Sequence, residues 1–222
     1  MKSLVAALLA TLALAAQAQP ADALLDQALA GPQRSEANRA RDAARHPRET
    51  LLFFGLQPGQ TVIELAPGGG WYTEILAPVL RQRGTLIAAA SPSDGSEYDQ
   101  KSRRNFEDKL RTTPALYDKV QVGTLPKGKR FSDLNVPGGA DLVLTFRNLH
   151  NWMSAGFASE ALAALHRALK PGGILGVEDH RADPSKPVDE RATNGYVNED
   201  YAIRLIESAG FELLERSEIN AN

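Results

Sequence analysis

The sequence contains no cysteine, and this absence removes several kinds of chemistry at once. It excludes disulfide bonds, thiolate metal ligands, a cysteine nucleophile and a lipid-modified N-terminal cysteine. The chain also lacks a large excess of charge of either sign, since 25 Lys and Arg stand against 27 Asp and Glu. A net charge of -2 gives no indication of a nucleic-acid partner or of an acidic membrane surface.

Long apolar runs are missing too, except at the N-terminus. A basic start at Lys2 is followed by the apolar run Leu4 to Ala16, and Ala16-Gln17-Ala18 has the small-x-small pattern of a cleavage site. The run is too short to span a membrane, and no stop-transfer pattern follows it. We therefore expect a signal peptide over residues 1–18, a periplasmic or secreted protein, and no stable membrane insertion. The alternative, a buried or amphipathic N-terminal helix, is disfavoured because no polar face interrupts the run.

The next part of the chain, residues 19–56, reads as a helical segment. Its expected helices are Ala21 to Ala30, Ser35 to Arg45, and a third that begins at Pro47 and ends at Phe54. The second helix is rich in arginine, and we expect Arg39, Arg41 and Arg45 to form a solvated face.

From residue 57 onwards the pattern alternates between short β-branched or apolar runs and amphipathic helical stretches. The strands that we expect are 61–66, 85–90, 119–123, 141–146, 174–177 and 211–219. The helices expected between them are 71–83, 97–111, 155–169 and one capped by Asn198. This order predicts, for residues 57–222, an α/β domain of the Rossmann-like, doubly wound type, with a mostly parallel sheet covered by helices on both faces. Ligands of such sheets lie beyond the carboxyl ends of the strands.

A glycine turn after the first strand is the most informative motif. It joins Glu64 at the strand end to Gly68-Gly69-Gly70, directly before a helix. Glycine lets the backbone adopt positive φ and come close to a ligand, and a helix start offers free N–H groups. A dinucleotide site would need a third glycine where Thr73 stands, so a nicotinamide-dependent oxidoreductase is a poor match. A purely structural strand-to-helix corner is the other reading of the turn.

The turn resembles the first motif of class I methyltransferases, an acid followed by alternating glycines, with Ala66 in the place of the first glycine. The stretches RHPRETLLFFGLQPGQTVIELAPGGGWYTEILAP, LTFRNLHNW, LKPGGILGVEDHRA and SAGFELLERSEIN are similar to a group of exported bacterial proteins described as predicted methyltransferases. The resemblance covers nearly the whole mature chain. It implies that S-adenosylmethionine is the cofactor, that Glu64 anchors its amino end, and that Ala66, Gly68, Gly69 and Gly70 line its methionine part.

Three features depart from that family pattern. The second strand ends in Ala90-Ser91 without the acid that usually grips the cofactor ribose, so either Ser91 or Asp94 substitutes for it or the ligand is a different one. The chain stops at Asn222, soon after the sixth strand-like segment, where the fold normally adds an antiparallel seventh strand, which suggests a truncated reading frame or a fragment. Export also separates the protein from the cytosol, where S-adenosylmethionine is made.

Polar residues at the ends of the fourth and fifth strands are the candidates for chemistry. Arg147 and Asn148 follow the fourth strand and join the expected cofactor set, and His150 comes directly after them. Asp179 and His180 follow the fifth strand. His150 or His180 is the candidate base, because histidine titrates near neutral pH, and Asp179 would orient either one. The spacing of these three residues matches no strong metal-binding signature, so we expect no metal.

The sequence therefore predicts an S-adenosylmethionine-dependent methyltransferase that acts on a small-molecule or envelope acceptor. The alternative is a non-catalytic, exported ligand-binding module on the same scaffold, since a fold does not dictate a function. The sequence leaves the acceptor and the oligomeric state open.

Overall fold

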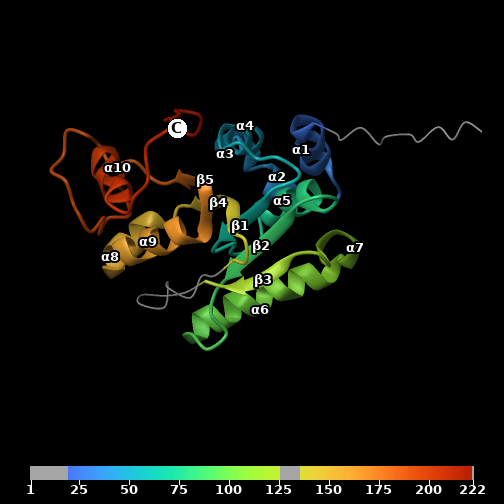
Figure 1. Ribbon diagram of the computed structural model, residues 1–222. Helices are drawn as coiled ribbons and strands as arrows, with labels where there is room; N and C mark the ends of the chain where they lie inside the picture. Colours follow the sequence, from blue (N-terminus) through green and yellow to red (C-terminus); the bar gives the residue numbers. More distant parts are fainter. Residues whose placement is uncertain (1–19, 126–135, 222) are drawn as a thin grey trace, which may run out of the picture.

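The structure, a computed structural model, describes residues 20–125 and 136–221. The signal peptide expected at 1–18 and most of the loop expected at 126–139 lie outside the described residues. The described chain forms one parallel sheet with helices on both faces (Figure 1).

The sheet confirms the expected fold class. Its strand order is β3-β2-β1-β4-β5, and every neighbouring pair is parallel. The strands are β1 (Thr61–Leu65), β2 (Thr85–Ala90), β3 (Gln121–Thr124), β4 (Ala140–Phe146) and β5 (Leu169–Glu178). Since all five run in the same direction, their carboxyl ends meet at one edge of the sheet, and the chain order switches beside β1.

The helices include two whose starts are marked by capping residues. Ser96 and Asp99 form a capping box at the start of α6, and the Asn198 side chain accepts the Tyr201 N–H at the start of α10. Those in the N-terminal segment are α1 (Ala21–Ala30), α2 (Glu36–Arg39), α3 (Asp42–Arg45) and α4 (Pro47–Phe53). The others are α5 (Thr73–Leu80), α6 (Glu97–Thr112), α7 (Pro114–Tyr117), α8 (Leu149–Ala155), α9 (Ala158–Ala168) and α10 (Glu199–Glu207).

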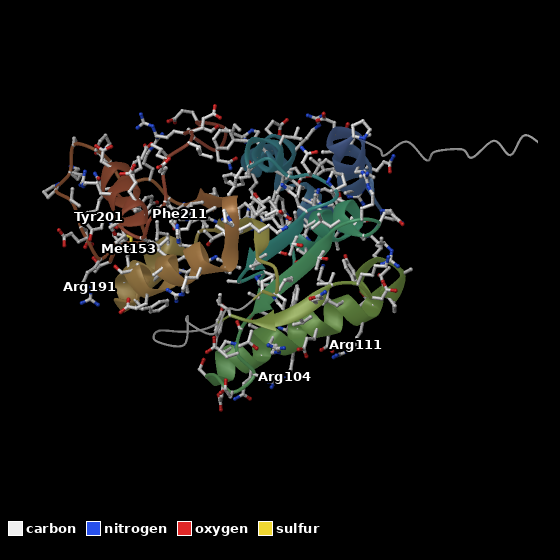
Figure 2. The ribbon with its side chains drawn as sticks, in the orientation of Figure 1. Arg104, Arg111, Met153, Arg191, Tyr201 and Phe211 are labelled. Atoms are coloured by element: carbon white, nitrogen blue, oxygen red, sulfur yellow. The ribbon has the colours of Figure 1, made fainter. Side chains whose placement is uncertain are left out.

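Alternate strand residues pack into different helix layers, as the two-residue period of a strand requires. Val62 of β1 lies in a cluster with residues of α1, α4 and α5, whereas Ile63 lies in a cluster with residues of α8 and α9. On α6, Phe106 is buried against the sheet, while Arg104 and Arg111 are exposed (Figure 2). Because α1 and α4 share a core with β1, the 19–56 segment packs directly on the domain that follows it.

A buried ion network holds the N-terminal segment to α5. Arg34 is fully buried and donates to Asp42 at 2.5 and 2.7 Å, and its Nε lies 3.7 Å from Glu74 of α5. Asn38 Nδ2 donates to both oxygens of Glu74, and Lys109 of α6 pairs with the same carboxylate. A buried charge costs several kcal/mol unless it is paired, so this network fixes how the segment sits.

Of the three arginines expected on a solvated face, two are exposed and one is half-buried. Arg39 and Arg41 are exposed, but the Arg45 guanidinium lies 4.9 Å from the centre of the Trp71 ring and is half-buried. The Arg41 guanidinium also reaches that ring, at 5.8 Å. An arginine in this position gains a cation–π contact with the aromatic face, which the helical pattern alone does not reveal.

Some expected elements are wrong. The single helix expected at 35–45 is two short helices, α2 and α3. The helix expected at 155–169 is α9, which starts only at Ala158, and α8, which ends before Gly156 with its φ of 75°, was not expected. The strand expected at 211–219 does not form, and these residues have no regular secondary structure. A strand needs a neighbour for its hydrogen bonds, and this stretch has none in the described structure, where Leu214 is 77% exposed.

In the described part of the chain, no helix is long and apolar enough to cross a bilayer.

The burial of Leu142 and the exposure of Leu214 predict that replacing each by alanine will change the free energy of unfolding by different amounts. Leu142 of β4 is fully buried, so Leu142→Ala leaves a cavity and should lower the free energy of unfolding by about 2–5 kcal/mol. The same change at the exposed Leu214 should alter it by less than about 0.5 kcal/mol. Urea unfolding of both variants measures this, and equal effects would contradict the packing described above.

Candidate functional site

The corner after β1 is built by positive backbone angles. Ala66, Gly68 and Gly70 have φ values of 50°, 57° and 77°. The Ala66 N–H donates to Ala89 O at 3.0 Å, so the corner starts as a continuation of the β1–β2 pairing. An alanine in this region carries about 1–2 kcal/mol of steric cost, which explains why the related motif has glycine there.

One side of this corner is open. A Cβ built on Gly68 or Gly69 would meet no atom within 4 Å, and both residues are exposed. Gly70 is different, because a Cβ there would lie 2.9 Å from the Lys109 side chain and 3.3 Å from Phe106. Gly68 and Gly69 thus offer bare backbone at the carboxyl edge of the sheet, while Gly70 allows close packing against α6.

Glu64 lies beneath the corner as a buried acid. It is 2% exposed, and the Thr73 hydroxyl of α5 donates to its Oε2 at 2.6 Å. Burial raises the pKa of Glu64 to about 7, against the opposing effect of the Thr73 hydrogen bonds. A carboxyl group with this pKa can be protonated or ionised near neutral pH, and its ionised form can pair with a positively charged ligand group.

The loop after β2 emerges beside the corner, because Leu65 and Ala89 are paired. Ser91 is half-buried, and its carbonyl oxygen accepts from Arg103 Nη1 at 3.2 Å. Asp94 is exposed in the same loop. Arg103 also reaches Gly123 O, at 3.4 Å, and so ties the ends of β2 and β3 together.

The turn after β4 lies on the other side of β1. Arg147 adopts a φ of 58°, a strained conformation of the kind that often marks functional sites, and its N–H donates to Glu178 O at 2.7 Å. Asn148 donates to the Thr145 hydroxyl at 3.2 Å and stands at the N-cap of α8. Burial raises the pKa of Glu178 despite the nearby Arg147.

Two aromatic residues line the same region. Tyr72 stacks on Phe146 of β4, with ring centroids 3.6 Å apart and an interplanar angle of 12°. Burial raises the pKa of Tyr72, and the charges of Glu178 and Glu64 raise it further. Both Tyr72 and its neighbour Trp71 are buried.

The three residues that were candidates for chemistry meet directly. His150 lies in the first turn of α8, not in a loop, and its Nδ1 is 2.7 Å from Asp179 Oδ1. The backbone N–H of His150 donates to Asp179 Oδ2 at 3.0 Å, and that of His180 donates to Oδ1 at 2.7 Å. The His150 and His180 rings are 5.9 Å apart. Asp179 therefore orients His150 through its side chain and contacts His180 only through the backbone.

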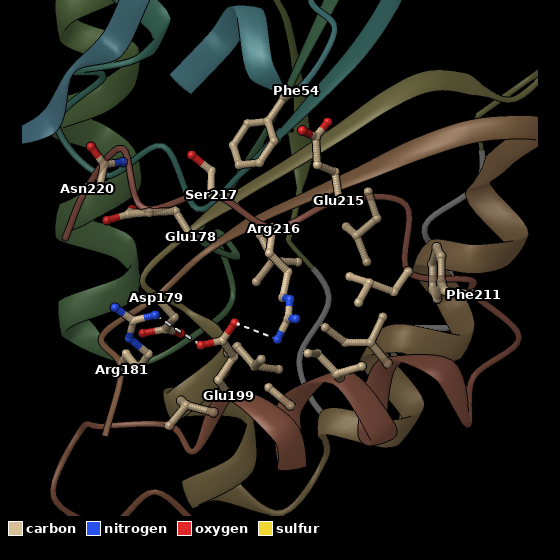
Figure 3. A pocket seen from close by; sticks show the side chains of 18 of the residues that line it. Phe54, Glu178, Asp179, Arg181, Glu199, Phe211, Glu215, Arg216, Ser217 and Asn220 are labelled. Atoms are coloured by element: carbon tan, nitrogen blue, oxygen red, sulfur yellow. Dashed lines mark hydrogen bonds and ion pairs between the residues drawn. The ribbon is translucent and has the colours of Figure 1, made fainter. Parts of the chain in front are cut away.

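A large cavity opens beside β5 and is distinct from the glycine corner. Its volume is about 1980 Å³, and residues from β5, α10 and the 211–221 segment line it (Figure 3). Arg181 donates to Glu199 at 3.0 Å and to Glu218 at 2.5 and 2.6 Å. Glu178 and Asp179 lie on its wall, but the residues of the glycine corner do not.

The site residues expected from the sequence thus lie at or just after the carboxyl ends of β1, β2, β4 and β5, and Asp179 is in direct contact with both His150 and His180. The structure adds residues that the sequence reading missed, namely Thr73, Arg103 and Glu178. Thr73 was considered only as a missing glycine, although a hydroxyl on the first residue of the helix is well placed to bond a strand-end acid. Among the described residues, no group of three or more His, Asp or Glu side chains is arranged to hold a metal ion.

The raised pKa of Glu64 predicts that the free energy of unfolding depends on pH. The pKa rises from 4.5 in the unfolded chain to about 7 in the folded protein. The bound proton therefore contributes stability that is complete below about pH 4.5 and is lost as the pH rises through about 7. At about 1.4 kcal/mol per pKa unit, the difference in unfolding free energy between wild type and Glu64→Gln should change by about 3 kcal/mol across this window. Urea unfolding at several pH values measures it, and parallel curves for the two proteins would contradict the assignment.

Comparison with known proteins supports the same fold. No protein-family model matches the chain. An uncharacterized methyltransferase from Synechocystis sp. is 31% identical over 132 residues, which are 59% of this chain and 52% of that protein. The chain therefore spans about half the length of this curated relative.

Solved structures match over more of the chain. A SAM dependent methyltransferase from Aquifex aeolicus has a TM-score of 0.60 at 18% identity, over 79% of this chain and 85% of its own. The cyclase SpnF also has a TM-score of 0.60, at 20% identity, over 84% of this chain and 63% of its own. CrArsM, an arsenic (III) S-adenosylmethionine methyltransferase from Chlamydomonas reinhardtii, has a TM-score of 0.54 at 14% identity, over 80% of this chain and 62% of its own. With the all-parallel sheet and its strand order, these likenesses show that the chain has the Rossmann-like fold of class I methyltransferases.

Proposed function

We propose that the protein is an S-adenosylmethionine-dependent methyltransferase that acts on a small-molecule acceptor. The observation that carries this proposal is the open corner at Gly68 and Gly69 above the buried Glu64. The corner stands beside β1, where the strand order reverses, and this is the place where doubly wound folds bind their ligands.

The residues present fit the cofactor. The bare backbone of Gly68 and Gly69 leaves room for the methionine part, and Glu64 can give up its proton to pair with the cofactor's amino group. Ser91 and Asp94, in the neighbouring loop, are the polar residues placed to replace the missing ribose acid. When bound, S-adenosylmethionine supplies an electrophilic methyl group on a sulfonium. The chain's own part is to position the reactants and exclude water, which supplies much of the rate acceleration in such transfers.

The competing function is a non-catalytic binding module. SpnF, a cyclase by name, shows that this fold also occurs in a protein named for another activity. The argument for methyl transfer therefore depends on the corner and on the acids around it, and the fold alone is insufficient.

The backbone offers a matched pair of variants to test cofactor binding. Gly69 and Gly59 are both exposed, neither has positive φ, and a Cβ on either meets nothing within 4 Å. Gly69→Val places a branched side chain in the proposed cofactor position, whereas Gly59→Val lies in the turn before β1, at the opposite edge of the sheet. We expect calorimetry with S-adenosylhomocysteine to show at least about tenfold weaker binding for Gly69→Val and unchanged binding for Gly59→Val.

This pair is cleaner than a change at Gly70, where an added side chain would collide with Lys109 and disturb the fold itself. Absence of heat with wild-type protein at millimolar ligand would overturn the proposal. Equal affinity for the two variants would place the ligand elsewhere.

We also propose that the protein is exported, on the strength of the basic, apolar and small-residue pattern of residues 1–18. In a Gram-negative host, the full chain should yield a periplasmic product that begins at Gln19, and a chain starting there with an added Met should stay in the cytoplasm. Cell fractionation with N-terminal sequencing measures both. Recovery of the uncleaved full chain from the cytoplasm would contradict export.

A further inference from the structure

We propose that His150 is the catalytic base and that the acceptor is an aromatic hydroxyl, whose proton His150 Nε2 receives. This inference rests on the proposed methyl transfer and names the class of substrate for it. It is carried by three features: the fixed tautomer of His150, the charges around it, and a row of rings beside it.

Hydrogen bonding fixes which nitrogen of His150 is free. Asp179 Oδ1 already accepts the His180 backbone N–H, and Oδ2 accepts that of His150. An oxygen that accepts from one N–H can take a second donor, so the 2.7 Å contact to Oδ1 places the imidazole proton on Nδ1. Nε2 is then the acceptor in the neutral ring, and no other residue in the described ranges, 20–125 and 136–221, bonds to it.

Charged groups lie around His150. Asp179 is in contact with it, and Glu178 precedes Asp179 on β5. The cations on this side are Arg147, at the end of β4, whose charge acts on Glu178, and His180. Arg181 is neutralised by Glu199 and Glu218. An imidazolium formed at His150 would stand against the Asp179 carboxylate, which is its ion-pair partner.

A row of rings next to His150, which we call the shelf, consists of His150, His180 and Tyr196, with neighbouring rings tilted by 43° and 48°, and offers faces and edges to an aromatic acceptor. The His180 ring is 5.9 Å from that of His150 and 5.8 Å from that of Tyr196, which is 51% exposed. A short parallel bridge holds Tyr196 in place, because the Val197 N–H donates to His180 O and the Ala182 N–H donates to Val197 O, each at 2.8 Å. Aromatic groups at such spacings interact favourably with a further ring.

The chemistry balances with these groups alone and the proposed cofactor. The acceptor oxygen bonds to the methyl carbon, the carbon–sulfur bond leaves its electron pair on sulfur, and the hydroxyl proton passes to His150 Nε2. The positive charge thus moves from sulfur to an imidazolium beside Asp179. A neutral amine would attack through its lone pair without first losing a proton, so it makes less use of a base placed in this way.

A coloured phenol tests the proton transfer without cofactor. Ionised 4-nitrophenol absorbs at longer wavelength than the neutral form, and 4-nitroaniline has the same ring with an amine. At a pH one unit below the half-ionisation point of free 4-nitrophenol, we expect wild-type protein to bind it in the ionised form. We expect His150→Gln to bind it roughly tenfold more weakly and without the spectral shift, because a charge-assisted hydrogen bond is lost. His166→Gln, a histidine change outside the shelf, should behave as wild type.

Asp179 is a positioning residue in this scheme, so its test reads the tautomer of His150. Nitrogen-15 NMR of the ligand-free protein should show a proton on Nδ1 of His150 in wild type and a changed tautomer balance in Asp179→Asn. An unchanged His150 signal would overturn that role.

The remaining outcomes also decide the proposal. Failure to bind 4-nitrophenol, tighter binding of 4-nitroaniline, or an equal spectral shift in His150→Gln would each overturn it. Calorimetry with S-adenosylhomocysteine keeps the two proposals apart, since His150→Gln should bind it within about twofold of wild type. If the cofactor product binds and the phenol test fails, methyl transfer stands and only the acceptor assignment is lost.

Discussion

The parallel pairing of β1 with both of its neighbours is the constraint on which the rest of the structure depends. Because Leu65 is paired with Ala89 on one side and with Thr145 on the other, the segments that follow three strands leave the sheet at one edge. The pairing of Phe146 with Glu178 adds the end of β5 to the same edge. A slip in register would move every side chain on the slipped strand to the opposite face. The open corner and the His150–Asp179 contact are thus two consequences of a single hydrogen-bonded ladder.

The buried network around Glu74 has a related effect on the other side of the corner. Glu74 lies in the first turn of α5, directly after the glycines, and receives Asn38 from the N-terminal segment and Lys109 from α6. Trp71, at the end of the corner, donates to Asn38 O at 2.9 Å. The start of α5 is therefore held from two directions, so the positive φ values before it are maintained by packing as well as by the absence of side chains. The N-terminal segment therefore supports the corner of the proposed cofactor site.

The sequence predicted the parts of this molecule that depend on local pattern, and it missed those that depend on pairing between distant segments. Strand β1 and the glycine turn were correctly predicted because apolar β-branched runs and glycines act locally. The 211–219 segment has the same strand-like composition, yet it lacks a partner in the described structure and forms no strand. Arg34 was overlooked since nothing in its sequence neighbours reveals that Asp42 and Glu74 surround it. The pairing of Asp179 with His150 was left open against His180, and only the β4–β5 register, which sets the end of one strand beside that of the other, decides it.

Two carboxyl groups at this edge have raised pKa values for the same reason, burial, but their surroundings give them different uses. Glu64 is buried at the corner, and among the described residues its hydrogen-bond partner is Thr73, so its carboxylate can pair with a cationic ligand group that takes the place of its proton. Glu178 is near Arg147, Asp179 and His180, whose charges act on it, so it belongs to the charged cluster that follows β4 and β5. In that cluster Asp179 is the acid that contacts the His150 ring. Glu64 thus suits a positive charge on a ligand, and Asp179 suits one transferred to the protein. Separating the two at the ends of β1 and β5 keeps the binding step and the proton step from competing for the same carboxylate.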